Sequence, residues 1–176
     1  MFRVVKLILL VSIFSVLAGC ASGVVRMDGA GKDVPVAKVE PVVKSVNVFL
    51  SDAAKKLVPE NLKFNQETLR STIERSLQAQ NMIRADTSQK LDIEITGFRV
   101  RSAFTAIMFG FMAGNDNVEG VVTITDAMGK VLKKAKVSAS YALGGIGGGQ
   151  DESRMAWLYE EFTKHTVAEL SGVLTK

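Results

Sequence analysis

Apolar and polar residues alternate with a period of two along several stretches of the chain, and this alternation predicts β-strands. The first stretch is SVNVFLSD (45–52), and the clearest is KLDIEITGFRVRS (90–102). Within the second, the apolar positions change phase at Gly97, which is typical of a β-bulge. NVEGVVTITDAMGKVLKKAKVSASY (117–141) predicts a hairpin of two further strands. Lys133 shares the inward phase of the last strand, so we expect either its end to be exposed or the register to shift.

Two other stretches carry apolar residues three or four positions apart, the spacing of an amphipathic helix. In KFNQETLRSTIERSLQAQN (63–81), Asn65 is placed to cap the first turn. The apolar stripe of this helix consists of Leu69, Ile73 and Leu77. DESRMAWLYEEFTKHTVAELSGVL (151–174) predicts the second helix, with Asp151 at its start. The order strand, helix, three strands, helix predicts an α+β fold, a two-layer sandwich in which one mixed sheet carries both helices on one face.

The first 19 residues have the composition of a secretory signal peptide. Arg3 and Lys6 are the only charges ahead of Cys20, and the apolar run that precedes the cysteine is too short for a comfortable membrane span. Cys20 is the only cysteine of the chain, so a disulfide or a zinc site has no second thiol.

The stretch Leu17-Ala18-Gly19-Cys20 resembles the bacterial lipobox. In proteins with that motif the thiol receives a diacylglyceryl group, the preceding peptide bond is cut, and the new amino terminus is acylated. The resemblance implies cleavage between Gly19 and Cys20 and a lipid on Cys20. The three acyl chains of this lipid would bind the protein to the membrane far more firmly than a single chain. An aspartate after the cysteine would resemble an inner-membrane retention signal. Because Ala21 and Ser22 stand there instead, we expect the outer membrane, with the protein facing the periplasm.

The predicted organisation is a signal peptide (1–19), a lipidated tether (20–44) and a single α+β domain (45–176). Glycines and prolines among small and charged residues, without a regular period, indicate that the tether is flexible. The chain has 22 Lys and Arg against 18 Asp and Glu, and two of the basic residues belong to the signal peptide. Since a nucleic-acid-binding protein usually carries a basic stripe, this near balance predicts no nucleic-acid partner.

The segment AFTAIMFGFMAG (103–114) carries no charge and is apolar on both of its potential strand faces. Three interpretations stay open: a connection folded over the core or an edge, a protein–protein contact, or a contact with the membrane. A membrane-spanning strand is disfavoured, because such strands alternate apolar and polar residues. The candidate interface residues are Phe104, Ile107, Met108, Phe109, Phe111 and Met112.

None of the sequence patterns indicates a catalytic site. LGGIGGGQDES (143–153) has glycines ahead of a helix, but it lacks the lysine and the spacing of a phosphate-binding loop, so we expect a linker. His165, the only histidine, lies at the border of an apolar stripe and is more typical of a packed residue. Asp92 and Glu94 share one strand face, which is more simply the solvated face. We expect no enzyme, no metal and no cofactor.

The order of these parts resembles one uncharacterised lipoprotein family, domain of unknown function 4410. The resemblance is carried by the lipobox, LDIEITGFRV, the glycine-dotted apolar insert, VEGVVTITDAMGKVL and the glycine-rich entry to the last helix, and it covers about residues 46–170. The family has no assigned activity, so it implies no catalytic residue. The strand–helix–three-strand plan is more distantly similar to the periplasmic part of the curli-secretion channel lipoprotein. There, long apolar inserts form a membrane barrel in a ring of subunits, whereas the insert here is short and does not alternate.

We therefore expect a non-catalytic, lipid-anchored envelope protein that is attached to the membrane through Cys20 and faces the periplasm. It would bind or scaffold other envelope components, through a protein partner or through self-association. The alternative is a subunit of an oligomeric outer-membrane secretion or pore assembly that uses the apolar segment 103–114.

Overall fold

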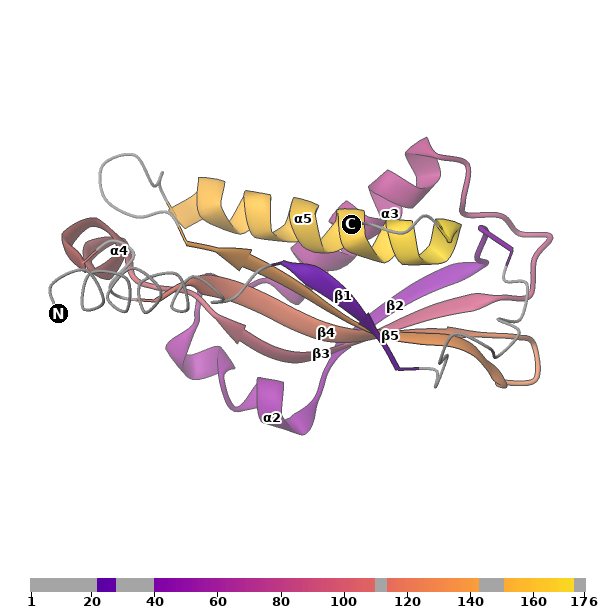
Figure 1. Cartoon of the computed structure of the whole chain (residues 1–176), viewed down its shortest axis with the longest axis horizontal. Helices are drawn as coiled ribbons and strands as arrows, with labels where there is room; N and C mark the ends of the chain where they lie inside the picture. The colour runs from indigo at the N-terminus through magenta and orange to yellow at the C-terminus, as the bar shows by residue number, and fades with distance from the viewer. Residues whose placement is uncertain (1–21, 28–39, 110–113, 143–150, 173–176) are drawn as a thin grey trace, which may run out of the picture.

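The computed structural model describes residues 22–27, 40–109, 114–142 and 151–172. A layer of strands runs beneath two long helices (Figure 1). The described elements are, in chain order, β1 (Gly23–Arg26), β2 (Ser45–Leu50), α2 (Asp52–Lys55), the 3-10 turn η2 (Val58–Glu60), α3 (Gln66–Ala79), β3 (Lys90–Arg99), α4 (Ala103–Phe109), β4 (Asp116–Thr125), β5 (Val131–Tyr141) and α5 (Asp151–Ser171).

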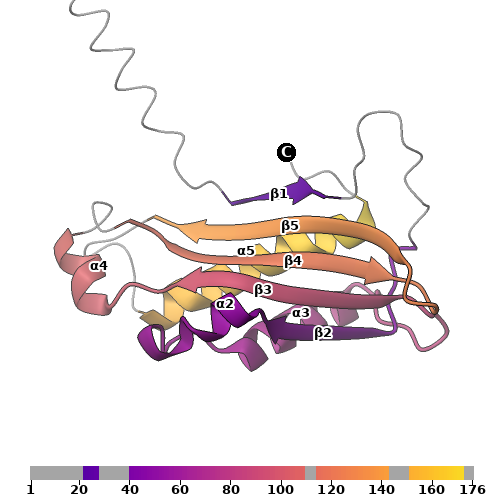
Figure 2. The ribbon, with the colours of Figure 1, turned by 90° about the horizontal axis from the view of Figure 1, so that it is seen from below.

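The five strands form one mixed sheet in the order β1-β5-β4-β3-β2. β2 runs parallel to β3, and the other neighbouring pairs are antiparallel. The parallel pair requires a crossover between its strands, and α3 supplies it. Two perpendicular views show α3 and α5 on the same face of the sheet (Figures 1 and 2). The predicted α+β fold, with one mixed sheet and both long helices on one face, is confirmed.

The core lies between the sheet and these two helices. Asn65 caps α3 as predicted, because its Oδ1 accepts the Thr68 amide at 2.9 Å. The phenyl ring of Phe162 on α5 sits directly over Gly120, where a Cβ would come within 3.0 Å of the ring. The predicted stripe of α3 is fully buried in the same core as alternate residues of β3, and this group comprises Leu69, Ile73, Leu77, Leu91, Ile93 and Ile95.

The register shifts twice along the strands, once at the predicted β-bulge and once beside Lys133. The register of β3 against β4 shifts between Ile95 and Gly97, so the predicted β-bulge is confirmed. The register of β4 against β5 also shifts, between Ile124 and Thr125, yet Lys133 points inward and is buried. Of the two expectations for this lysine, the exposed end is wrong, whereas the register shift is present directly beside it. A carboxylate from α5 lies beside the lysine and makes its burial tolerable.

β1 lies inside the segment that we expected to be a flexible tether. It pairs with β5 in antiparallel register, from Gly23 opposite Ser138 to Arg26 opposite Ala135. Four residues are too few for an alternating pattern to reveal a strand. Residues 28–39 of the expected tether lie outside the described residues, and the domain limits stay a prediction.

Candidate functional site

The end of the sheet next to α4 carries the start of the apolar segment that the sequence singled out. β3 ends there, β4 begins there, and β5 returns to it. α4 leads away from this end, beyond the strands (Figures 1 and 2). Its first turn is capped by Ser102, whose Oγ accepts the Thr105 amide at 3.1 Å. The apolar segment therefore begins as a short helix, and the charge-free sequence alone did not indicate that.

α4 exposes large apolar side chains. Phe104 is 67% exposed, Met108 63% and Phe109 58%. These three side chains do not cover the core, so the interpretation of a connection folded over the core is wrong for them. The side chain of Ile107, and residues Phe111 and Met112, lie outside what the structure describes. The six candidate interface residues stay a prediction.

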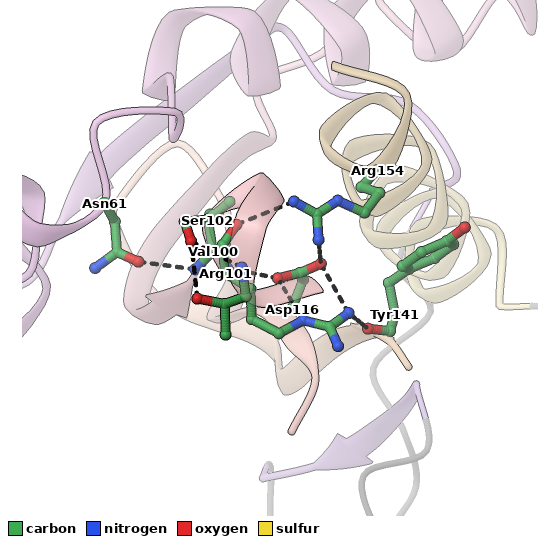
Figure 3. A network of polar contacts seen from close by, with 8 residues as sticks. Asn61, Val100, Arg101, Ser102, Asp116, Tyr141 and Arg154 are labelled. Carbon is green, nitrogen blue, oxygen red and sulfur yellow. Dashed lines mark hydrogen bonds and ion pairs between the residues drawn. The ribbon is translucent and has the colours of Figure 1, made fainter. Parts of the chain in front are cut away.

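A buried cluster of charges holds the base of α4 to the sheet (Figure 3). Asp116, at the start of β4, accepts the backbone amide of Arg101 at 2.6 Å. Its Oδ2 lies 3.1 Å from a guanidinium nitrogen of Arg101 and 3.1 Å from one of Arg154. We call these three residues the charge cluster. All three side chains are essentially inaccessible to solvent.

The charge cluster also makes two hydrogen bonds to backbone oxygens. Arg154, in the first turn of α5, donates to the carbonyl of Arg101 at 3.0 Å. Arg101 donates to the carbonyl of Tyr141, at the end of β5, at 3.3 Å. Asn61 accepts the Val100 amide at 2.8 Å from the other side (Figure 3). The residues that precede α4 are thus fixed relative to β4, β5 and α5.

The start of β1 is fixed at the same end. The Ser140 amide donates to Ser22 Oγ at 2.9 Å, and Ser138 Oγ donates to the Gly23 carbonyl at 3.4 Å. At the other end of β1, Arg26 pairs with Glu169 of α5 at 3.5 Å. Cys20 lies outside the described residues, but two residues span at most about 7 Å, so its Cα is at most that far from the Cα of Ser22.

The single histidine and the paired acids do not form a site with one another. His165 is buried on α5, with Nε2 3.2 Å from Glu161 of the same helix. Asp92 and Glu94 are half-buried on the sheet face opposite α3 and α5, and Asp92 accepts from Asn47 at 3.3 Å. Across the part of the chain that the structure describes, three His, Cys, Asp or Glu side chains are nowhere grouped so that they could hold a metal ion.

A cleft of about 240 Å³ lies between the start of α3 and the first turns of α5. Tyr159 lines it, and its hydroxyl oxygen accepts the Asn65 amide at 2.7 Å. Burial raises the pKa of Tyr159, while that hydrogen bond acts in the opposite direction. The hydroxyl is therefore protonated at neutral pH and serves to join α3 to α5. Lys63 and Glu152, at the rim, lie 3.7 Å apart.

The charge cluster and the docking of β1 were missed in the sequence. Arg101, Asp116 and Arg154 are distant along the chain, and no period relates them. One signal was present: Arg101 and Asp116 flank a charge-free segment of 14 residues that follows a strand. Among the described helices, none combines the length and the apolarity needed to cross a membrane.

Three solved structures that match this chain are distant from it in sequence. The PelC dodecamer from Paraburkholderia phytofirmans, in a point-variant form, is 13% identical with a TM-score of 0.49 over 89% of this chain and 100% of that one. A minor lipoprotein from Acinetobacter baumannii is 12% identical with a TM-score of 0.38 over 73% and 93%. A crystal structure of an uncharacterized protein is 13% identical, with a TM-score of 0.46 over 77% and 94%.

Among curated proteins, none matches the sequence. One family model does, over residues 33–145, which is more than half of the chain. This match runs from ahead of β2 through the end of β5, and so includes α4 and the first two members of the charge cluster. The chain belongs to the family described as domain of unknown function DUF4410.

Proposed function

We propose that this protein is a non-catalytic, lipid-anchored component of the bacterial cell envelope. Its lipid is attached to Cys20, and its domain is held at the periplasmic face of the outer membrane, where it binds or scaffolds other envelope components. One observation carries the proposal: the cysteine of a lipobox-like stretch lies only two residues ahead of Ser22, which is hydrogen-bonded into the sheet. A thiol at that position is well placed to hold the whole domain at a bilayer.

The roles of the buried ionisable groups support a non-catalytic protein. Asp116 is shared by two guanidinium groups, and Glu169 by Lys133 and Arg26. Perturbed or buried ionisable groups in an enzyme usually face a cleft that admits substrate. Arg101 borders a cleft of about 230 Å³, but the carboxylates of Asp116 and Glu169 join secondary-structure elements to one another inside the fold, as structural ion pairs do.

The anchor is tested by replacing the thiol. We expect Cys20→Ser to carry no acyl groups and to keep residues 1–19, because in proteins with the lipobox the cut follows lipidation of the thiol; intact-mass measurement shows both. Ser22→Ala is the matched control, because it changes a hydroxyl two residues away and keeps the thiol. An unmodified Cys20 in the purified natural protein, or removal of residues 1–19 from the Cys20→Ser variant, would refute the proposal.

The membrane that holds the protein and the partners that it binds need separate measurements. Ala21→Asp introduces an acidic residue that resembles an inner-membrane retention signal, so we expect it to move the lipidated protein to the inner membrane. Cross-linking in native envelopes then separates the two modes of action. Cross-links to other envelope proteins support a scaffold, whereas a closed ring of identical copies would favour the oligomeric secretion or pore assembly.

A further inference from the structure

The attachment point and the exposed apolar helix lie at the same end of the molecule. Ser22 is bonded to Ser140 on β5, and Ser140 is paired with Asn117 on β4, which is paired with Arg99 on β3. These residues form one row across the sheet. With about 4.8 Å between neighbouring strands, the three steps from β1 to β3 put the last residue of β3 about 14 Å from the start of β1. α4 begins four residues after Arg99.

The link between lipid and domain is short compared with the domain itself. Two residues span at most about 7 Å, whereas a strand of ten residues, such as β4, is about 33 Å long. The domain therefore cannot turn its opposite end, with the β4–β5 turn, to the bilayer while the lipid stays inserted. The end that carries α4 faces the membrane.

We propose that α4 docks on the same bilayer that holds the lipid, with Phe104, Met108 and Phe109 among the lipid head groups. This inference rests on the proposed lipid anchor and adds the contact made by the described part of the candidate interface. Helices that lie in the interface plane bury their apolar side chains about 5–10 Å deep, and the exposed Phe and Met side chains of α4 are suited to such a contact. A protein partner for α4 would have to fit between the domain and the membrane, and the link from Cys20 to Ser22 leaves little room there.

The chemistry of the surrounding surface agrees with this orientation. Trp157, on the second turn of α5, is 38% exposed and packs on Tyr141 with ring centroids 5.1 Å apart. Tyr and Trp are the side chains that collect at membrane–water interfaces. The opposite end of the sheet instead presents charged residues around the β4–β5 turn, including Asp126 and Lys130. Within the described residues, the exposed side chains of α4 share their end of the sheet with the bonded start of β1, whereas exposed Met128 and Val131 lie beside charged residues at the other end.

The chain offers a matched pair of reporter positions. Met108 on α4 and Met128 in the β4–β5 turn are both strongly exposed, 63% and 89%, and they lie at opposite ends of the sheet. Cys20 is the only cysteine, and acylation would consume its thiol. Met108→Cys and Met128→Cys therefore each provide a single free thiol for an environment-sensitive fluorophore. Because both side chains are exposed, neither substitution disturbs the core.

The experiment uses the full lipidated chain in vesicles of phosphatidylethanolamine and phosphatidylglycerol, some of which carry a nitroxide quencher on the lipid. Flotation with the vesicles is measured first. We expect the fluorophore at position 108 to shift its emission to the blue and to be quenched at least about twice as strongly as the one at 128, because interfacial helices lie within reach of such quenchers.

The outcomes separate this inference from the proposed function. A chain that floats while its label at 108 is quenched no more than the label at 128 overturns the docking of α4 and leaves the anchor in place. A label at 108 that is shielded from water-soluble quenchers but not reached by the lipid-borne one also overturns it, since a protein would then cover α4. A chain that does not float refutes the anchor and the docking together.

Discussion

Asp116 accepts the backbone amide of Arg101 and faces two guanidinium groups while it is fully buried. A buried carboxylate is stable only if opposite charges and hydrogen bonds replace the water it has lost. The same carboxylate makes the burial of two arginines tolerable. At the scale of single residues, the carboxylate of Asp116 holds the end of β3, the start of β4 and the first turn of α5 together.

Asp116→Asn keeps the size of the side chain and removes its charge. We expect the free energy of unfolding to fall by about 3–5 kcal/mol, because two buried guanidinium groups lose their shared anion. Glu119→Gln is the control: Glu119 lies on the same strand and pairs with Lys136 at 2.6 Å, but both side chains are well exposed. Glu119→Gln should lower the free energy of unfolding by less than about 1 kcal/mol. Urea denaturation measures both, and equal effects would contradict a structural role for the cluster.

Tyr159 gives the fold a pH dependence at the alkaline end. Burial raises the pKa of its hydroxyl above the unfolded value of about 10, so the unfolded chain loses this proton at a lower pH than the folded one. The stabilisation is fully present below pH about 10 and is lost as the pH rises through the folded pKa. We expect the alkaline decline of unfolding free energy to be shallower in Tyr159→Phe. An identical slope in both proteins, measured by denaturation from pH 8 to 11, would contradict this.

At the scale of elements, Lys133 joins a strand to the end of a helix. Its ammonium donates to the backbone carbonyl of Glu169 and lies 3.1 Å from the carboxylate of the same residue. Glu169 is in the last turn of α5, where carbonyl groups have no partner within the helix. A cation also complements the negative end of the helix dipole. Lys133 thus caps α5 from the sheet, and Glu169 in turn pairs with Arg26 of β1.

Lys133→Met should cost about 1–3 kcal/mol of unfolding free energy, since it removes the cap and leaves the buried carboxylate with Arg26 alone. We also expect faster amide hydrogen exchange in the last turn of α5. Lys136→Met is the matched control, because Lys136 lies three residues along the same strand and faces solvent. If both variants exchange equally at the end of α5, Lys133 is not its cap.

The elements that the sequence predicted are those whose burial repeats along the chain. Alternate positions of β3 and every fourth position of α3 face the core, so the period of the pattern reports the element and its buried face. Even the bulge near Gly97 appears as a change of phase. Lipidation of Cys20 could be predicted from local sequence for a similar reason, because the lipobox-like stretch consists of adjacent residues.

The elements that escaped prediction are short or depend on distant partners. β1 has four residues, and its position comes from β5, more than a hundred residues away. α4 exposes apolar side chains, so burial imposes no period on it. The charge cluster joins Arg101, Asp116 and Arg154, which meet only after the sheet and α5 have formed. Long-range contacts of this kind leave no local pattern.

At the scale of the whole molecule, the docking of β1 changes how the domain is attached. A flexible tether of 25 residues would let the domain explore distances of about 25–30 Å from the lipid in every orientation. With Ser22 bonded to Ser140, only the link from Cys20 to Ser22 separates the lipid from the sheet. The remaining residues between β1 and β2 then lie off the path from lipid to sheet, because that path already ends at β1.

Two insertions of the same flexible sequence test this difference. About ten Gly and Ser residues between Ala21 and Ser22 lengthen the path from lipid to sheet to roughly 18 Å, whereas the same insertion between Gly31 and Lys32 lies beyond β1 and leaves that path unchanged. Both variants should keep the lipid and float with vesicles. The lipid-borne quenching of a label at Met108→Cys should fall by about half or more with the first insertion, because the effective concentration of α4 at the bilayer drops. It should be retained with the second. Equal losses from the two insertions would mean that β1 does not fix the attachment point, and the short link between membrane and domain would have to be abandoned.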